Sequence, residues 1–329
     1  MATLSTTNMT LADLVNRQDP DGKIAKIIEL LSATNEVLDD MPWMECNDGM
    51  GHKTTIRSGL PAGTWRLLNY GVQPEKSTTV QVRDATGMLE SYAEVDKKLV
   101  DISTDPAGLR FSEDRAFIEG MNQTFATTLF YGDSGTNPER FTGLAPRFNL
   151  KSAENGQNIL DAGGTGSTNT SIWLVCWDES ILHGLYPKGT SAGLISEDLG
   201  QQTLFDAANG KYEGYRTHYQ WDCGLTLRDW RYVVRIANID VTALTKNAAT
   251  GADLLDWMVQ AIELLPNTRM GRAVFYVNRT IRSYLRRQMM NKSNVWLSME
   301  EVAGKKVLAF DQIPVKRVDA LLNTEARVV

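Results

Sequence analysis

The chain has 329 residues, which is enough for one large domain or two ordinary ones. Hydrophobic residues make up 42% of the sequence and charged residues 22%, a balance typical of globular proteins. The 34 Lys and Arg against 40 Asp and Glu give a net charge of −6. This excludes a protein that binds polyphosphate through bulk charge, because such proteins carry a basic excess.

The cysteines and the N-terminus indicate the compartment. Three cysteines, Cys46, Cys176 and Cys223, are an odd number without short spacing, so we expect reduced thiols and neither a disulfide framework nor a zinc site. Residues 1–10 lack a basic region followed by an apolar run, so the sequence predicts no secretory signal. No apolar stretch approaches the roughly 18 residues of a membrane helix. We therefore expect a soluble intracellular protein.

The N-terminal segment is predicted to be helical. Asp19 and Pro20 form a plausible N-cap followed by proline at the first helical position, and Pro42 ends the run. Apolar side chains recur between them at helical spacing, at Ile24, Ile27, Ile28, Leu31 and Leu38.

Residues 46–82 have a different character. Glycine and proline punctuate three short runs with strand-like composition, at residues 54–57, 65–68 and 78–82. A segment of this kind buries little of its own surface. It therefore predicts an extended hairpin that depends on contacts outside itself.

The strongest helix signal covers residues 113–131. Ser112 is a suitable N-cap, and Glu113 and Asp114 would lie in the first turn, where the helix dipole favours negative charge. The apolar side chains at Phe117, Met121, Phe125 and Leu129 follow one another at intervals of four. Gly132 would end this rod of roughly 28 Å.

The remaining chain mixes strands and helices. Residues 149–171 are polar and glycine-rich, which indicates a loop or a subdomain boundary. Strands are expected at residues 172–177, 215–221, 232–236, 273–277, 306–310 and 314–318, and helices at residues 253–265 and 278–290. No internal repeat is present. The sequence predicts the α+β class, with two interleaved lobes and an extended arm.

Residues 132–135 are a candidate for a catalytic serine site. Gly132-Asp133-Ser134-Gly135 matches the sequence around the nucleophile of trypsin-like serine proteases, which also need a histidine base and a carboxylate on two β-barrels. Here it follows a long helix, and the only upstream histidine, His52, lies between short strands. A tight turn, with Asp133 or Ser134 capping the backbone, is the favoured interpretation. A hydrolase using Ser134 is the weaker alternative.

Other candidate sites are weaker still. Residues 164–169 begin like a dinucleotide-binding fingerprint, but they lack its third glycine and its flanking strand and helix, so they indicate a loop. The three histidines, His52, His183 and His218, show no metal-ligand spacing. The acidic pairs Asp39-Asp40 and Glu300-Glu301 indicate solvated surface, and Cys176 a buried, unreactive thiol. We expect no catalytic residue, no cofactor and no metal.

Arginine and tryptophan suggest contact surfaces. Arg279, Arg282 and Arg286 fall within about 60° of one another on the predicted helix, opposite an inner face at Ile281, Leu285 and Gln288. They form either a solvated face or a contact surface for carboxylates of another subunit or for a polyanion. On an acidic chain, bridging between subunits fits better than sequence-specific nucleic-acid binding.

Tryptophan is frequent in the chain, with eight residues. Five stand in polar or loop-like surroundings, at Trp43, Trp65, Trp221, Trp230 and Trp296, whereas Trp257 fits a helix core. Core packing explains about half of them, and anchoring in protein–protein contacts explains the rest. Together with the hairpin, they indicate a protein that completes itself by assembly.

Three segments, residues 51–72, 130–147 and 227–240, carry a family resemblance. Through them, nearly the whole chain resembles the major capsid proteins of tailed double-stranded-DNA bacteriophages, which share the Hong Kong 97-like fold. The closest resemblance is to podovirus-type coat proteins of similar length. It implies a structural protein, not an enzyme, that assembles as pentamers and hexamers into the icosahedral shell around the phage DNA. A portal or decoration protein is the alternative within the virion.

The resemblance also implies a domain plan. It places an N-terminal helical arm at residues 1–45 and an extended loop that reaches over a neighbouring subunit at residues 46–83. A peripheral domain would span residues 84–149, with the spine helix at 113–131. The axial domain would span residues 150–265, and residues 266–329 would return strands and a helix to both domains.

Inter-subunit contacts and partners follow as expectations. The candidate contact residues are Arg57, Trp65, Arg66, Tyr70, Arg147, Arg231, Arg235, Arg279, Arg282 and Arg286, of which Arg147, Arg231 and Arg235 would bridge elements inside or between subunits. The expected partners are other copies of the chain, a separate scaffolding protein, a portal, a possible cement protein and packaged DNA held by weak non-specific contact. No membrane is expected. The protein would assemble in the host cytoplasm and reside in the virion.

Overall fold

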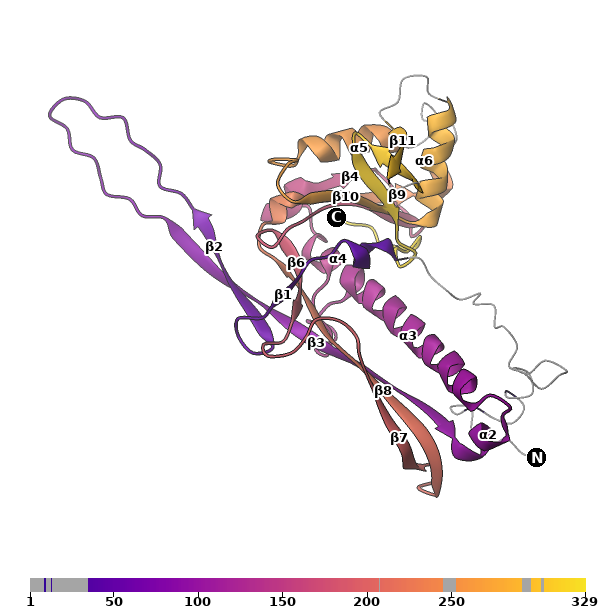
Figure 1. The fold of residues 1–329 in the computed structure, drawn as a ribbon. Helices are drawn as coiled ribbons and strands as arrows, with labels where there is room; N and C mark the ends of the chain where they lie inside the picture. The colour runs from indigo at the N-terminus through magenta and orange to yellow at the C-terminus, as the bar shows by residue number, and fades with distance from the viewer. Residues whose placement is uncertain are drawn as a thin grey trace.

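The computed structural model describes residues 9, 13, 35–206, 208–244, 253–291, 297–302 and 305–329. Figure 1 shows three parts: an upper unit of sheet and helices, a lower elongated unit built on a long helix, and a hairpin that projects away from both. Strands and helices alternate irregularly along the chain, which places the fold in the α+β class. Among the described helices, none is long and apolar enough to cross a membrane.

The lower unit contains a six-stranded sheet within the described residues. Its order is β1 (Trp43–Glu45), β6 (Leu182–Tyr186), β8 (Lys211–Leu227), β3 (Thr78–Asp96) and β2 (Gly51–Gly59), and β7 (Ile195–Phe205) also pairs with β8. Strand β3 lies antiparallel to β8 from Thr86 opposite Gly224 to Asp96 opposite Gly214. The sheet thus combines residues from the expected peripheral domain with residues 182–227.

Strand β3 links the hairpin to this sheet. It has 19 residues, which is roughly 60 Å of extended chain. Its first part pairs with β2, from Thr78 opposite Gly59 to Ala85 opposite Gly51, and its second part pairs with β8. Because one continuous strand takes part in both, the hairpin is a rigid extension of the lower unit at its base.

The long helix α3 (Pro106–Tyr131) packs along β3 and β8. It begins at Asp105, whose side chain accepts a hydrogen bond from Gly108 N at 3.0 Å, with Pro106 at the first helical position. The expected N-cap, Ser112, is wrong, because its hydroxyl donates to Leu109 O inside the helix. The helix has 26 residues and is about 39 Å long, and it ends at Gly132 as the sequence predicts.

The upper unit contains a seven-stranded sheet within the described residues. Its order is β11 (Leu297–Val302), β12 (Lys305–Phe310), β13 (Ile313–Arg317), β10 (Arg272–Val277), β5 (Asn169–Trp177), β9 (Val233–Asp240) and β4 (Ile159–Asp161). Every residue of β5 is buried, because helices and the lower unit cover both faces. Helix α5 (Leu254–Glu263) packs on β9, and α6 (Arg279–Asn291) packs on β13.

Short elements connect these parts. They are the helices α2 (Lys97–Ile102) and α4 (Leu144–Arg147) and the 3-10 helices η1 (Glu36–Asp39), η2 (Glu154–Asn158), η3 (Trp230–Tyr232) and η4 (Val241–Ala243). The main hydrophobic core runs from α3 through β5, β9 and β10 to α5 and α6. It therefore joins the upper unit to the top of the long helix.

Most predicted elements are present, with several differences. The predicted strand at residues 65–68 is irregular chain. The sequence did not predict five strands and two short helices, which are β1, β4, β6, β7, β11, α2 and α4. The predicted N-terminal helix lies outside the described residues up to residue 34, and its end forms the 3-10 helix η1. Asp253 caps α5 through Asp256 N, which explains why that helix begins where the sequence predicts.

Candidate functional site

The tip of the hairpin, residues 60–77, is the most exposed part of the described chain. It carries large apolar side chains that lie in solvent: Trp65 is 101% exposed, Leu68 86% and Leu60 79%. Tyr70 is also exposed, as are Arg57 on β2 and Arg66 beside Trp65. Such an exposed cluster of apolar and arginine side chains is typical of a protein–protein interaction surface.

Polar contacts brace the base of the hairpin. Asp48 forms ion pairs with Lys53 and Arg83, both at 3.1 Å, and its pKa lies below the usual value because Lys53 and Arg83 favour the charged form. Across the two strands, Thr86 donates its backbone N–H and its hydroxyl to Met50 O, both at 2.9 Å. These contacts fix the direction in which the hairpin leaves the lower unit (Figure 1).

Arg147 lies inside the chain, close to the base of the hairpin. Its guanidinium pairs with the buried carboxylate of Asp84 at 2.8 Å and donates to the carbonyls of Thr142 and Leu225, both at 3.2 Å. The same Asp84 accepts a hydrogen bond from Thr226 Oγ1 at 2.5 Å. Arg147 therefore ties α4 to β3 and β8 within the subunit, which is one of the two roles that the sequence predicts for it.

Two histidines that are far apart in the sequence meet beside this pair. The rings of His52 on β2 and His183 on β6 lie 5.7 Å apart, edge to face, and Arg228 Nη2 contacts His52 Nε2 at 2.7 Å. Burial, together with the Arg228 charge, lowers the pKa of His52 and lowers the pKa of His183 to about 4. No group of three or more potential metal ligands occurs among the described residues.

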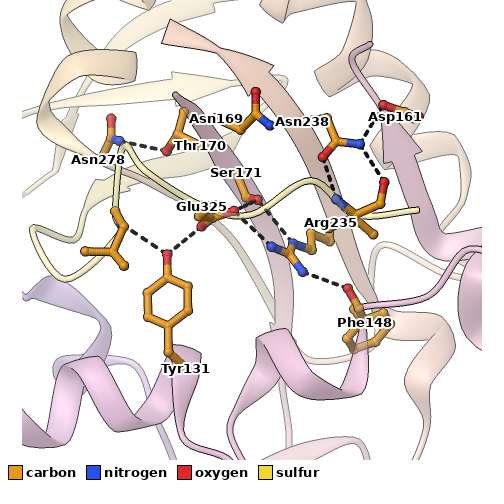
Figure 2. A network of polar contacts seen from close by, with 12 residues as sticks. Tyr131, Phe148, Asp161, Asn169, Thr170, Ser171, Arg235, Asn238, Asn278 and Glu325 are labelled. Atoms are coloured by element: carbon orange, nitrogen blue, oxygen red, sulfur yellow. Dashed lines mark hydrogen bonds and ion pairs between the residues drawn. The ribbon is translucent and has the colours of Figure 1, made fainter. Parts of the chain in front are cut away.

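Arg235 is the centre of a buried network that holds the C-terminal segment (Figure 2). It pairs with Glu325 at 2.9 Å, and both side chains are only 4% exposed. It also hydrogen-bonds Phe148 O at 2.8 Å and Ser171 Oγ at 3.1 Å. Tyr131 at the end of α3 donates to the other oxygen of Glu325 at 2.5 Å.

This burial agrees with the first of the two roles predicted for Arg235, a bridge between elements inside the subunit. Its guanidinium also lies over the ring of Trp173, 5.1 Å from the centroid. Burial, and then the carboxylate of Glu325, raises the pKa of Tyr131. Nearby, the side-chain amide of Asn238 accepts a hydrogen bond from Val328 N at 2.8 Å and donates to Val328 O at 2.9 Å. The same amide nitrogen also donates to Asp161 Oδ1 at 2.8 Å. The network therefore joins α3, the upper sheet and the C-terminus.

The other arginine candidates lie at the surface. Arg231 is 57% exposed and pairs with Asp229 at 2.7 Å on its own chain. Arg279, Arg282 and Arg286 share the outer face of α6, and Ile281 and Leu285 on the inner face are fully buried. The expected orientation of this helix is confirmed.

One surface prediction needs correction. Asp40 is not solvated: it is buried and accepts from Lys316 Nζ at 2.6 Å, Arg272 Nη2 at 2.8 Å and Tyr276 Oη at 2.8 Å. Trp43 and Trp221 pack against Phe125 of α3, so they are among the tryptophans that core packing explains. Trp296 lies outside the described residues.

The other motifs form structural features. Asp133 accepts hydrogen bonds from Gly135 N at 2.9 Å and Thr136 Oγ1 at 2.7 Å, so the tetrapeptide at 132–135 is a capped turn as expected. Residues 162–168 form irregular chain before β5. All three cysteines are free and buried, and burial raises the pKa of Cys176 to about 12. Such a thiol is unreactive.

The family comparison identifies the protein class. Residues 19–329 match the family model described as major capsid protein GP7. The chain belongs to this family. It is a shell-forming capsid protein of a tailed bacteriophage, of the podovirus type, and the family match does not favour the portal or decoration alternative.

Solved structures agree with this capsid assignment. A chain from the cryo-EM structure of bacteriophage Epsilon15 is 44% identical, with a TM-score of 0.78, and the match covers 100% of this chain and 99% of that one. A chain of the bacteriophage JBD30 capsid shares the fold at 10% identity, with a TM-score of 0.50 over 90% of this chain and 95% of that one. Comparison with curated proteins gives no match. The capsid protein thus has the Hong Kong 97-like fold.

Sequence reasoning found the exposed hairpin of the capsid protein but missed its internal anchors. Asp84, Thr226 and Glu325 carried no local signal, because each acts through a partner that is distant in the sequence. Arg235 and Glu325, for example, are separated by 90 residues.

Proposed function

We propose that the hairpin tip, residues 60–77, carries each capsid subunit onto its neighbour in the pentamers and hexamers of the shell. The observation that supports this most strongly is the full exposure of Trp65, flanked by the exposed Leu67 and Leu68. Burying one such side chain at a contact contributes about 1.5–3 kcal/mol. Arg57, Arg66 and Tyr70 would add polar contacts around this apolar centre.

The geometry of the hairpin suits this role. Its base is braced by Asp48, Arg83 and Lys53, whereas every residue of its tip, residues 60–77, is exposed. Because the base is rigid and the tip is exposed, the hairpin can hold its tip against a neighbouring subunit. Individually weak contacts become a stable shell when each subunit is held by several neighbours, and weak contacts also let misplaced subunits dissociate.

The experiment replaces the apolar tip. Trp65→Ser should raise the subunit concentration needed for shell formation at least tenfold, because a loss of about 1.4 kcal/mol per contact is a factor of ten. Sedimentation and negative-stain microscopy measure shells, and circular dichroism shows that the subunit still folds. Leu150→Ser, which removes an exposed apolar side chain outside the hairpin, is the matched control. Unchanged assembly of Trp65→Ser would refute the proposed contact.

The charges on the hairpin give a second test. Arg57→Glu and Arg66→Glu should misdirect assembly while the subunit remains folded, because both side chains are exposed. The same reversal at Arg147 should instead unfold the base of the hairpin, since Asp84 would face a second carboxylate. Normal particles from the double variant of Arg57 and Arg66 would exclude these two residues from the interface.

We further propose the domain plan, with one change. Strand β8 pairs with β3, and β7 pairs with β8, so we assign residues 195–227 to the peripheral domain and the remaining parts of 150–265 to the axial domain. Residues 1–45 would form the N-terminal arm, 46–83 the extended loop, and 266–329 the return segment. Limited proteolysis should cut the hairpin tip first and leave the β3–β8 sheet protected.

The remaining partners are proposals from the capsid family. We propose assembly in the host cytoplasm with a separate scaffolding protein, and a portal, packaged DNA and a possible cement protein as later partners. Expression with the neighbouring phage genes tests the scaffold: closed shells should require it, and closed shells from the chain alone would make it dispensable.

We also propose that the capsid protein has no enzymatic activity. Ser134 Oγ pairs with Thr142 Oγ1 at 2.6 Å, and none of the three histidines, all of which are described, hydrogen-bonds to it. A serine nucleophile needs such a base. Ser134→Ala should leave assembly unchanged, and loss of a hydrolytic activity in this variant would restore the hydrolase alternative.

A further inference from the structure

An arginine-lined groove runs along the outer face of α6. Its lining consists of five arginines and one serine, which are Arg279, Arg282, Ser283, Arg286, Arg287 and Arg317, and its volume is about 540 Å³. Four of the arginines come from α6 and the fifth from the end of β13, on which α6 packs. We call it the arginine groove. In Figure 1 helix α6 lies on the side of the upper unit away from the hairpin.

The helix cannot turn this face inward. Ile281 and Leu285 are fully buried on the opposite side, and Gln288 is 1% exposed. Because these residues fix the rotation of α6, the arginines remain together at the surface. Arg287 is held further by stacking over the ring of Tyr284, 5.2 Å from the centroid.

The groove keeps an excess of positive charge. Two carboxylates reach its arginines: Asp319 pairs with Arg279 at 3.2 Å and with Arg317, and Glu36 pairs with Arg282 at 3.4 Å. Within the described part of the chain, neither Arg286 nor Arg287 forms an ion pair, and both are exposed. Five positive charges against two negative ones leave an excess of about three on a chain whose net charge is −6.

The lining favours phosphate over a protein partner. The core of a stable protein–protein interface is depleted in charged residues, whereas the residues that line this groove are five arginines and one serine. The planar fork of arginine matches phosphate oxygens, and the pairing with Asp319 and Glu36 holds some of the side chains in place before a ligand binds. Along α6, Arg279 and Arg286 are seven residues apart, about 10 Å of helix. One DNA strand, with a charge every 3.4 Å of duplex axis, presents about three phosphates over that length.

We propose that the arginine groove binds the phosphate backbone of nucleic acid without reading its sequence, as a local contact between the capsid protein and DNA. The excess of about three charges would neutralise about three phosphates. Such binding is weak and strongly dependent on salt, which is compatible with an acidic subunit. The inference rests on the groove and is independent of the hairpin contact.

The test uses the full chain as purified subunits and two labelled 20-base-pair duplexes of unrelated sequence, measured by fluorescence anisotropy between 50 and 200 mM salt. Both duplexes should bind equally well. Arg286→Gln combined with Arg287→Gln should weaken binding at least tenfold at 50 mM salt and reduce the slope of log K against log salt by about 2. The matched control, Arg115→Gln with Arg269→Gln, removes the same charge from exposed positions outside the groove and should change affinity less than twofold.

Four results would overturn the proposal. They are no binding by the unmodified chain at 50 mM salt, equal losses in the groove and control variants, a strong preference for one duplex, and displacement of the duplex by polyglutamate as effectively as by inorganic polyphosphate. The last result would assign the groove to carboxylates of another subunit. Groove variants should still form shells. Shell assembly therefore tests the hairpin proposal, and duplex binding tests this one.

Discussion

Replacing Glu325 by glutamine tests the buried network that joins the C-terminus to α3. The substitution keeps the side-chain volume but removes the negative charge opposite Arg235, and both side chains are only 4% exposed. The guanidinium would keep two neutral acceptors, Phe148 O and Ser171 Oγ. Breaking a buried ion pair on one side costs about 3–5 kcal/mol. We therefore expect the free energy of unfolding to fall by that amount, a large part of the 5–15 kcal/mol typical of a domain.

Urea unfolding of purified subunits, followed by tryptophan fluorescence, measures this change. Arg231→Gln is the control, because its pair with Asp229 is more than half exposed on the arginine side and should contribute at most about 1 kcal/mol. In a double-mutant cycle with Arg235→Met, the loss of stability in the double variant should be smaller than the sum of the losses in the two single variants, by about 0.5–3 kcal/mol. A loss below about 1 kcal/mol in Glu325→Gln would refute the reasoning, as would additive losses in the cycle.

Two further predictions concern the lower unit. Burial and the nearby charge of Arg228 lower the pKa of His183 to about 4, so the unfolded chain, with a value near 6.5, binds more protons. The stability that this group contributes is complete above about pH 6.5, and the free energy of unfolding should fall by about 2 kcal/mol between pH 7 and pH 5, as measured by urea unfolding. His183→Leu should remove most of this pH dependence. The same pH dependence in the variant and the unmodified chain would contradict the prediction. Gly143→Ala would place a methyl group 2.5 Å from Thr128 O and should lower the free energy of unfolding by about 1–3 kcal/mol. Gly63→Ala is the control, because a methyl group there has nothing within 4 Å, and it should change stability little. Equal losses of stability in the two variants would contradict the close packing at Gly143.

Local signals predicted much of the fold. The helix that ends at Tyr131, the capped helix after Asp253 and the strand that leads into α6 follow from capping residues and apolar spacing. Strand β7 was missed because nearly all its residues are exposed or half-buried, so no alternation marks it. Helix α3 begins earlier than predicted, because Asp105 caps it and Pro106 occupies its first position.

The site could be predicted only in part. Exposed aromatic and arginine residues near 57–70 stood out by composition, and the rotation of α6 followed from helical spacing. Arg147 and Arg235 were expected to bridge elements inside or between subunits, but their partners Asp84 and Glu325 could not be predicted, because these pairs form only in the tertiary structure. The same holds for Asp40, whose partners come from residues more than 200 positions away.

A cryo-EM reconstruction of the assembled shell, at a resolution that traces side chains, tests the central claim most directly. The account predicts that residues 60–77 lie on a neighbouring subunit, with Trp65 buried in that contact and the base of the hairpin unchanged. A tip that folds back onto its own subunit, or that remains in solvent in the closed shell, would contradict it.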